Sequence, residues 1–247
     1  MAVLCSLLFN LGFFAWTLAI VVLGVPCLLL PRRFTYRLGA LWVRISLALL
    51  AGVVGLGHRV VGLEHRLNGA AIYAVKHQSA WDTLIFALLL EEPAYVLKRE
   101  LTFVPFFGWL LRRAGMIPVD RAGRASALRR MIGQAKRTAA EGRPLLIYPQ
   151  GTRTAPGEHR PYQPGVAALY GQLGLPVVPV ALNSGLFWGR RQFVKRPGTI
   201  TVEFLPAIPP GLPRKAFMAE LERRLEGASA RLCLPDAAAV PDHRRAV

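Results

Sequence analysis

The sequence is poor in charged residues and very poor in acidic ones. Charged side chains make up 18% of the 247 residues and hydrophobic side chains 53%, a composition that excludes an intrinsically disordered chain. Only 14 Asp and Glu stand against 31 Lys and Arg, which gives a net charge of +17. Such a surplus attracts phosphate-bearing partners, whether nucleic acids, anionic lipids or small acidic molecules, and does not choose among them.

Cysteine is also scarce. The three cysteines are odd in number and widely spaced, and two of them lie in apolar stretches: Cys5, Cys27 and Cys233. This pattern excludes a disulfide framework and a zinc knuckle and fits a reducing cytoplasm. The sequence shows no other credible cluster of metal ligands.

Residues 2–30 contain no charged side chain. About 20 helical residues suffice to cross a hydrocarbon core of ~30 Å, and nothing basic precedes Arg32, as a cleaved secretory signal would require. A second apolar run, residues 38–57, carries a single charge, Arg44. We therefore expect residues 1–57 to form membrane-anchoring helices, either a spanning pair or a half-buried hairpin. A chain that starts near His58 is expected to keep its site.

The remainder of the chain has an α/β pattern, in which short β-branched runs alternate with longer helical ones. This alternation predicts a central sheet flanked by helices, preceded by the N-terminal apolar membrane helices. We expect this domain to cover residues 58–234, followed by a flexible tail at 235–247. The expected strands are 59–63, 71–76, 94–97, 116–119, 145–148, 177–182 and 200–204. The expected helices are 80–90, 104–114, 124–141, 165–173 and 214–226.

The segment from His77 to Asp82, His-Gln-Ser-Ala-Trp-Asp, directly follows one expected strand. Five helical residues turn about 140°, so the two side chains meet only if His77 ends the strand and Asp82 lies in the first helical turn. One interpretation is a capping box of Ser79 and Asp82. Another is a dyad in which Asp82 orients the His77 imidazole as a general base. A nucleophilic Ser79 is the weakest, because the Gly-x-Ser-x-Gly elbow is missing.

Two further segments carry groups suited to phosphate. Tyr148-Pro-Gln-Gly-Thr-Arg153 follows an apolar strand and offers a flexible Gly151, the Thr152 hydroxyl and the Arg153 guanidinium. A plain turn with a solvated arginine is the simpler interpretation of that segment alone. Residues 98–137 are rich in Lys and Arg, partly as a solvated helix face and partly, beside a membrane anchor, as a surface for anionic headgroups.

Taken together, these segments resemble the glycerolipid acyltransferase family, best known from the 1-acyl-sn-glycerol-3-phosphate acyltransferases, over roughly residues 60–210. Four blocks occur in the family's order, which is far more specific than any one of them. They are His77 to Asp82, similar to the His-x4-Asp motif, then Lys98 to Leu101 with Pro105, Phe107, Gly108 and Trp109, then Gly115 to Arg121, and Pro149 to Arg153; Val177 to Val180 matches a later motif. The departure is Gln150, where the family usually has Glu, and it affects acceptor selectivity rather than fold or dyad.

The resemblance implies an enzyme that transfers an acyl group from acyl-CoA or acyl-carrier protein to the sn-2 hydroxyl of 1-acyl-sn-glycerol-3-phosphate. The product would be phosphatidic acid, in phospholipid biosynthesis. The implied catalytic residues are His77 and Asp82, the residues that bind the acceptor phosphate are Arg121, Gly151, Thr152 and Arg153, and the supporting residues are Lys98, Glu100 and Gln150. No metal or cofactor beyond the thioester co-substrate is implied.

The resemblance also implies membrane lipids as partners, and no nucleic acid. The enzyme would reside in the cell membrane, the inner membrane in a Gram-negative bacterium, with its catalytic domain on the cytoplasmic side. An acyltransferase for another lysolipid, such as lyso-ornithine lipid, is the alternative within this class. Two other classes stay open from the residues alone, a membrane-tethered module that binds nucleic acid and a serine esterase.

Overall fold

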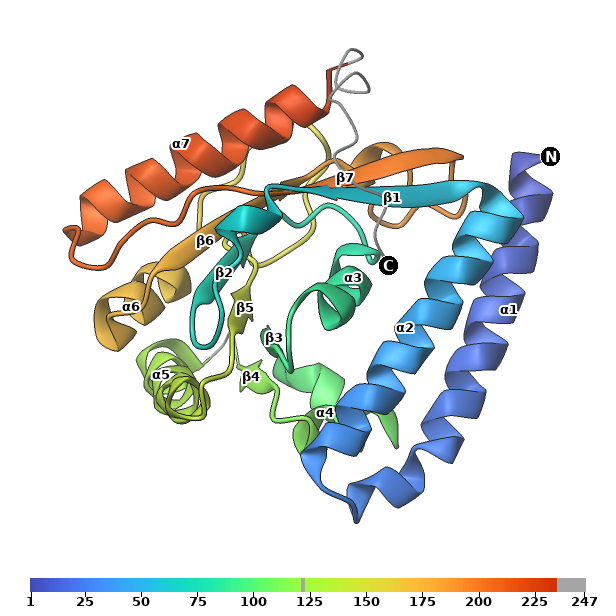
Figure 1. The fold of residues 1–247 in the computed structure, drawn as a ribbon, viewed down its shortest axis with the longest axis horizontal. Helices are drawn as coiled ribbons and strands as arrows, with labels where there is room; N and C mark the ends of the chain where they lie inside the picture. Colours follow the sequence, from blue (N-terminus) through green and yellow to red (C-terminus); the bar gives the residue numbers. More distant parts are fainter. Residues whose placement is uncertain (121–122, 235–247) are drawn as a thin grey trace.

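A seven-stranded sheet forms the centre of the molecule (Figure 1). The computed structural model describes residues 1–120 and 123–234, so the expected tail at 235–247 lies outside the described residues. The strands are β1 (Leu56–Val61), β2 (Ile72–Val75), β3 (Ala94–Lys98), β4 (Ile117–Val119), β5 (Leu145–Ile147), β6 (Val177–Leu182) and β7 (Gly198–Phe204). Their order in the sheet is β1-β7-β6-β2-β5-β3-β4. Among the strand pairs of the described residues, only β6–β7 is antiparallel.

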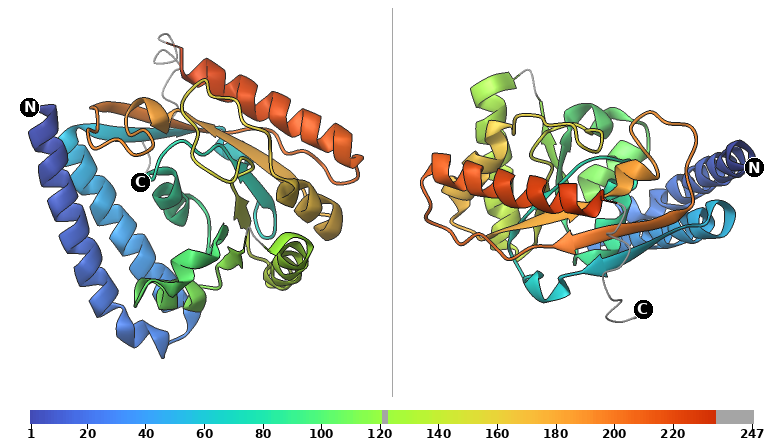
Figure 2. Two further views of the ribbon diagram at one scale, coloured as in Figure 1. Left: turned by 180° about the vertical axis from the view of Figure 1, so that it is seen from behind. Right: turned by 90° about the horizontal axis from the view of Figure 1, so that it is seen from above.

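Helices cover both faces of this sheet, as Figures 1 and 2 show. After residue 57 they are α3 (Asp82–Leu89), α4 (Phe107–Arg113), α5 (Arg124–Ala140), α6 (Pro164–Leu173) and α7 (Arg214–Leu232). Alternate residues of a strand point to opposite faces. Accordingly Tyr73 and Val75 of β2 pack in the core that includes α3, while Ile72 and Ala74 pack against α5, α6 and α7. The predicted sheet flanked by helices is confirmed.

The predicted strands and helices all occur, with shifts of at most three residues at their ends except in α7 (Arg214–Leu232), which continues past the expected end at Glu226. The largest shift at a strand is in β1, which begins at Leu56 instead of Arg59. Gly55 adopts a left-handed conformation with φ 73°, which ends the preceding helix and starts the strand at once. β1 then pairs with β7 in parallel, with His58 opposite Ile200.

Two long apolar helices precede the sheet, α1 (Ala2–Leu23) and α2 (Arg32–Val54), joined by the short 3-10 turn η1 (Val25–Leu28). They lie side by side in opposite directions (Figure 1). Both are long and apolar enough to cross a membrane, with mean hydropathies of 2.1 and 1.7. α1 exposes many large apolar side chains, namely Val3, Leu4, Leu7, Leu8, Leu11, Phe14, Leu18, Val22 and Leu23. The pair is therefore compatible with membrane attachment.

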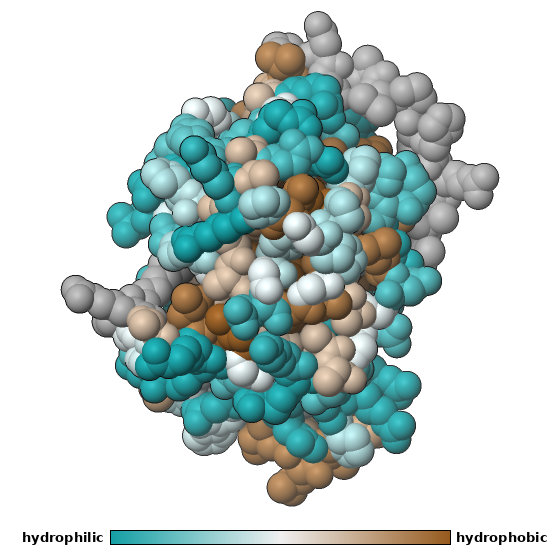
Figure 3. Space-filling view, turned by 90° about the vertical axis from the view of Figure 1, so that its left-hand side faces the viewer, coloured by the Kyte–Doolittle hydropathy of each residue, from teal (hydrophilic) through white to brown (hydrophobic). Residues whose placement is uncertain are grey.

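Hydrophilic and apolar side chains occupy different parts of the surface. Figure 3 shows that the face bearing α5, α6 and α7 is largely hydrophilic. Apolar side chains gather at the lower end of that view, where the turn between α1 and α2 lies in Figure 1. Further large apolar side chains are exposed next to this turn, on the 3-10 turn η3 (Arg99–Phe103), on α4 and between them: Leu101, Phe103, Val104, Phe106 and Trp109.

The helix pair is held to the rest of the chain at both of its ends. Next to η1, Arg32 forms ion pairs with Glu92 (3.2 Å) and Glu141 (2.7 Å). Toward the opposite end, Lys195 N donates to Ser6 Oγ at 2.9 Å, and the Lys195 ammonium donates to the Asn10 side-chain oxygen at 2.6 Å. Asn10 is the only strongly polar residue of the first apolar run, and this contact gives it a buried partner.

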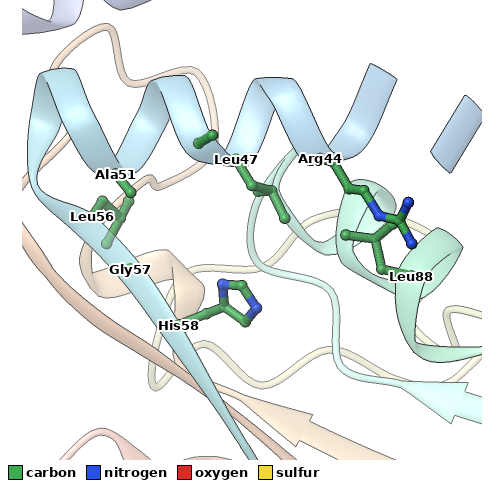
Figure 4. Close-up of a pocket in the computed structure, with 8 residues that line it drawn as sticks. Arg44, Leu47, Ala51, Leu56, Gly57, His58 and Leu88 are labelled. Atoms are coloured by element: carbon green, nitrogen blue, oxygen red, sulfur yellow. The ribbon is translucent and has the colours of Figure 1, made fainter. Parts of the chain in front are cut away.

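A small pocket of about 270 Å³ lies between α2, α3 and β1 (Figure 4). Arg44, the one charge of the second apolar run, lines this pocket and is exposed, so it interrupts the run at the surface and not in the core. His58 points into the pocket from β1, and burial lowers the pKa of its imidazole. The pocket is otherwise apolar.

Candidate active site

Four parallel strands end at one edge of the sheet, and the predicted site residues follow them. His77 follows β2, Lys98 ends β3, Asp120 follows β4, and residues 148–153 follow β5. The carboxyl ends of parallel strands are where open α/β sheets bind ligands. A cavity of about 1,460 Å³ opens at this edge and is lined by all four of these positions.

His77 and Asp82 form a hydrogen-bonded pair. The distance between His77 Nδ1 and Asp82 Oδ2 is 3.1 Å, with His77 just after β2 and Asp82 as the first residue of α3. The Asp82 side chain is 0% exposed and that of His77 12% exposed. A carboxylate on Nδ1 fixes the tautomer that carries the proton there, which leaves Nε2 as the basic atom. Because His77 lines the cavity, this arrangement suits a general base.

Three further donors hold the Asp82 carboxylate. Oδ2 accepts the backbone N–H groups of Gln78 (2.6 Å) and Ser79 (2.7 Å), and Oδ1 accepts the hydroxyl of Ser184. Ser79 Oγ accepts from Trp81 N, and the predicted capping box is incomplete, because α3 begins at Asp82 with Trp81 as its N-cap and no side-chain cap bond. The Asp82 carboxylate therefore binds the backbone of the turn before α3 as well as the imidazole. Ser79 is fully buried, which argues against a nucleophilic role.

Residues distant in the sequence complete the surroundings of His77. The Tyr148 ring stacks on the imidazole, with 4.0 Å between ring centroids, and its hydroxyl donates to the Asp82 carbonyl at 3.0 Å. Burial raises the pKa of Tyr148 well above its usual value, so the hydroxyl remains a donor. Thr154 N donates to the His77 carbonyl at 2.8 Å. Tyr148 adjoins a recognised motif, but no local signal in the sequence marks Ser184 as a partner of Asp82.

One part of the cavity is cationic. Gly151, Thr152 and Arg153 line it, together with Lys98 at the end of β3. No ion pair of Arg153 occurs within the described residues, so its guanidinium is available to an anion. Three further arginines that no sequence motif marks line the same cavity: Arg160, Arg190 and Arg191.

Three other predicted site residues differ in their position relative to the cavity. Glu100 is exposed on η3 and does not line the cavity. Gln150 lines the cavity but is only 3% exposed, and its amide nitrogen donates to Glu226 at 3.0 Å. Arg121 lies outside the described residues, although its neighbour Asp120 pairs with Arg99 at 2.9 Å.

A largely apolar part of the cavity extends between α1, α2 and α4. Its lining there includes Ile20, Val21, Leu38, Trp42, Val43, Leu110 and Leu111. Among the described residues, no group of three or more His, Cys, Asp or Glu is placed to hold a metal. The cavity thus joins a base, a cationic loop and an apolar groove, which are the parts needed to activate a hydroxyl group on an amphipathic substrate.

These features define the class of an acyl-transfer enzyme built on an α/β sheet. The family model described as Acyltransferase matches residues 57–183, which include the His77–Asp82 pair and the loop at 149–153. The chain belongs to this acyltransferase family, as the ordered motifs predicted, and it is an acyltransferase.

Relatives support this family assignment, and a solved structure has a similar fold. The chain is 36% identical over 226 residues to a 1-acyl-sn-glycerol-3-phosphate acyltransferase of Pseudomonas aeruginosa, covering 91% of this chain and 86% of that protein. It is 32% identical over 197 residues to an enzyme of the same name from Limnanthes douglasii, covering 78% and 68%. The fold is similar to the crystal structure of the 1-acyl-sn-glycerophosphate (LPA) acyltransferase PlsC from Thermotoga maritima. That comparison has a TM-score of 0.77 and 21% identity, and covers 94% of this chain and 98% of the other.

Proposed function

We propose that this protein transfers an acyl group from a thioester, acyl-CoA or acyl-carrier protein, to the sn-2 hydroxyl of 1-acyl-sn-glycerol-3-phosphate, giving phosphatidic acid for phospholipid biosynthesis. The observation that carries this proposal is the cavity, where the His77–Asp82 pair shares one space with the cationic loop of Arg153 and an apolar groove. A lysophosphatidate has the matching parts, a hydroxyl group, a phosphate and an acyl chain. The relatives named above support the same acceptor.

In the proposed reaction His77 acts as a general base. Its Nε2 takes the proton of the acceptor hydroxyl while that oxygen attacks the thioester carbonyl carbon. The carbon–sulfur bond then breaks, and the imidazolium returns the proton to the leaving thiolate. Asp82, held by its own donors, orients the ring and stabilises its positive charge. The acyl group passes directly to the acceptor, with no acyl-enzyme intermediate.

The alternative acceptor, lyso-ornithine lipid, rested on the departure at Gln150. In the structure this side chain is nearly buried, and its amide nitrogen binds Glu226. Arg153, in contrast, lines the cavity, and a guanidinium suits a phosphate group. These contacts favour lysophosphatidate.

An acyltransfer assay on the purified protein with a panel of lysolipids tests the acceptor, and parallel assays with acyl-CoA and acyl-carrier protein test the donor. We expect lysophosphatidate to give the highest kcat/KM. A preference for a lysolipid without a phosphate monoester would overturn the proposed acceptor.

Arg153 provides a sharper test of the phosphate site. We expect Arg153→Ala to raise the KM for lysophosphatidate by about 10-fold or more, since a charge-assisted hydrogen bond contributes about 1.5–3 kcal/mol, and to change the KM for the thioester little. Arg153→Lys should rescue only in part, because an ammonium is a point charge without the planar fork. Arg214→Ala, at the start of α7, is the matched control. A larger defect in the thioester KM would assign Arg153 to the donor instead.

We further propose that α1 and α2 enter the membrane as a half-buried hairpin, with the catalytic domain on the cytoplasmic side. The ion pairs of Arg32 and the Lys195–Asn10 contact tie the hairpin to the domain at both ends. A pair that crossed the whole bilayer would carry one of these attachments, with its charged groups, to the far side. The exposed apolar residues of α1 and of the η3–α4 region lie on the surface that would meet lipid.

A flotation assay with vesicles tests the attachment. Burial of apolar surface stabilises by about 25 cal/mol per Å² and does not depend on charge screening, whereas electrostatic attraction to lipid fades when the Debye length falls to about 3 Å at 1 M salt. We expect the protein to remain with vesicles in high salt and to leave them only in detergent. Complete extraction by salt would show that its basic residues are the only tether.

A further inference from the structure

A carboxylate on the last helix, Glu226 of α7, lies outside the residues matched by the family model. Its two oxygens accept hydrogen bonds from the Lys76 ammonium at 2.8 and 2.7 Å. The Lys76 side chain is only 2% exposed and that of Glu226 is 26% exposed, so the ammonium end of this ion pair is buried while the carboxylate reaches solvent. An ammonium in such a place needs its counter-charge, because burying an unpaired charge is costly.

Two more side chains bind the same carboxylate. Gln150 Nε2 donates to Glu226 Oε1 at 3.0 Å, and the Tyr162 hydroxyl donates to the same oxygen at 2.7 Å. Burial and the charge of Glu226 raise the pKa of Tyr162, so its hydroxyl stays protonated. Glu226 thus accepts hydrogen bonds from three separate parts of the chain.

These partners lie directly beside the catalytic segments. Lys76 immediately precedes His77, and its backbone N–H donates to the Val180 carbonyl of β6 at 3.0 Å. Gln150 immediately precedes Gly151, the first residue of the cationic loop. The Glu226 carboxylate therefore binds the side chain just before His77 and the side chain just before Gly151 of the cationic loop.

The charges around Glu226 are balanced because position 150 is a glutamine. A glutamate at position 150 would add an unbalanced negative charge. Lys76 and Glu226 neutralise each other, and Gln150 adds a donor without a charge. A glutamate there would put a second carboxylate about 3 Å from the first, and two carboxylates so close do not both ionise. Gln150 Oε1 is buried and has no hydrogen-bond partner among the described residues, so no protein donor stands ready for a second carboxylate.

We propose that Glu226 is a positioning residue of the acyl-transfer site, and that Gln150 and Glu226 form a matched pair in which Glu226 carries the single negative charge. This inference rests on the proposed function, because it concerns the geometry of the same site. It also accounts for the departure at position 150, since the negative charge comes from α7 instead of from the loop.

An exchange of the two side chains tests the pair directly. We expect Gln150→Glu and Glu226→Gln each to lower kcat/KM by about tenfold or more, the size of coupling seen within one salt-bridge network. The double variant, which keeps one carboxylate and one amide, should recover most of this loss. Glu220→Gln is the same change on the same helix, at a side chain that pairs with Arg223 and Arg224 of α7 itself, and it should leave the rate unchanged.

The pH dependence separates positioning from a general loss of stability. In Gln150→Glu the two neighbouring carboxylates share a proton more readily as the pH falls, which relieves their repulsion. The ratio of variant to wild-type kcat should therefore rise toward low pH, even though a histidine base makes both rates fall. The double variant should show a flat ratio. Tyr162→Phe, which removes one hydrogen bond and no charge, should lower kcat severalfold and still fold.

The outcomes are distinct. Additive defects in the double variant, or a flat pH ratio in Gln150→Glu, would overturn the matched pair. If the wild-type protein acylates a different lysolipid, the proposed acceptor fails, and the same variants test Glu226 with that lipid. If the wild-type protein acylates no lysolipid, the proposed function and this inference fail together. Unfolding midpoints of all variants show whether each protein is folded at the assay temperature.

Discussion

His77→Ala is expected to lower kcat for acyl transfer by about 10²- to 10⁴-fold, the usual contribution of a general base. The substitution removes the only basic atom that the Asp82 carboxylate orients into the cavity. It removes little packing, since the imidazole lies at the cavity wall. The variant should therefore remain folded and membrane-bound. Single-turnover acyl transfer, together with circular dichroism and flotation of the same preparation, measures all three properties.

Asp82→Asn should be severely impaired as well, and the structure gives two reasons. An amide no longer fixes the imidazole tautomer, and it replaces one of the two oxygens that accept from Gln78, Ser79 and Ser184. A drop in unfolding midpoint is thus expected beside the loss of rate, unlike in His77→Ala.

Ser79→Ala is the matched control for both variants, because it lies in the same segment. Its hydroxyl accepts from Trp81 N in the turn before α3, so its loss should cost about 1 kcal/mol of stability, as for one hydrogen bond, and leave the chemistry intact. Near-normal turnover in His77→Ala would mean that the segment from His77 to Asp82 is a helix cap and nothing more. Loss of turnover in Ser79→Ala with a folded protein would favour a serine nucleophile.

The fold was predictable because strands and helices differ in hydrophobic period. β6 was predicted with its observed bounds, since all six of its residues are apolar and buried, as in a central strand covered on both faces. Helix ends depart further from the expected bounds, since α7 continues to Leu232, beyond the expected end at Glu226. Its buried Leu225, Ala228 and Leu232 continue the apolar stripe, so the pattern for the longer helix was present in the sequence.

The candidate site was predictable only where its residues are neighbours in the chain. His77 and Asp82 lie five residues apart, and one turn geometry brings them together. Ser184 and Glu226 reach the site through tertiary packing alone, from 102 and 150 residues away from Asp82 and Lys76. Neither carries a local motif, because a serine after a strand and a glutamate in a helix are ordinary surface patterns. The same holds for the contact of Lys195 with Asn10.

The N-terminal helices differ most from the sequence-based expectation. A chain that starts near His58 was expected to keep its site, as though the anchor were separable. In the structure α2 contributes Val43, Leu47, Leu50 and Val54 to the same core cluster as Ile85 and Phe86 of α3. α3 begins with Asp82. The residues that hold the dyad in place therefore pack directly against the anchor.

Removal of residues 1–54 is accordingly expected to unfold the face of the domain that bears α3 and to abolish activity, even on detergent-dispersed substrate. A single substitution separates this core role from membrane binding. Leu50 is 1% exposed and Leu41, on the same helix, is 44% exposed. Leu50→Ala should cost about 2–5 kcal/mol of unfolding free energy, the range for a buried leucine, while Leu41→Ala should cost about 0.5 kcal/mol or less. Denaturant titration of both variants in the same detergent measures the difference.

Two results would contradict the core role of α2. If the shortened chain folds and acylates dispersed substrate at a rate near that of the full protein, α2 serves the membrane and not the core. If Leu41→Ala is the more destabilising variant in detergent, the outward face of α2 packs against protein. The expected order follows from burial alone, because a cavity left by Leu50 cannot be filled by detergent, whereas the Leu41 side chain already faces the surrounding medium.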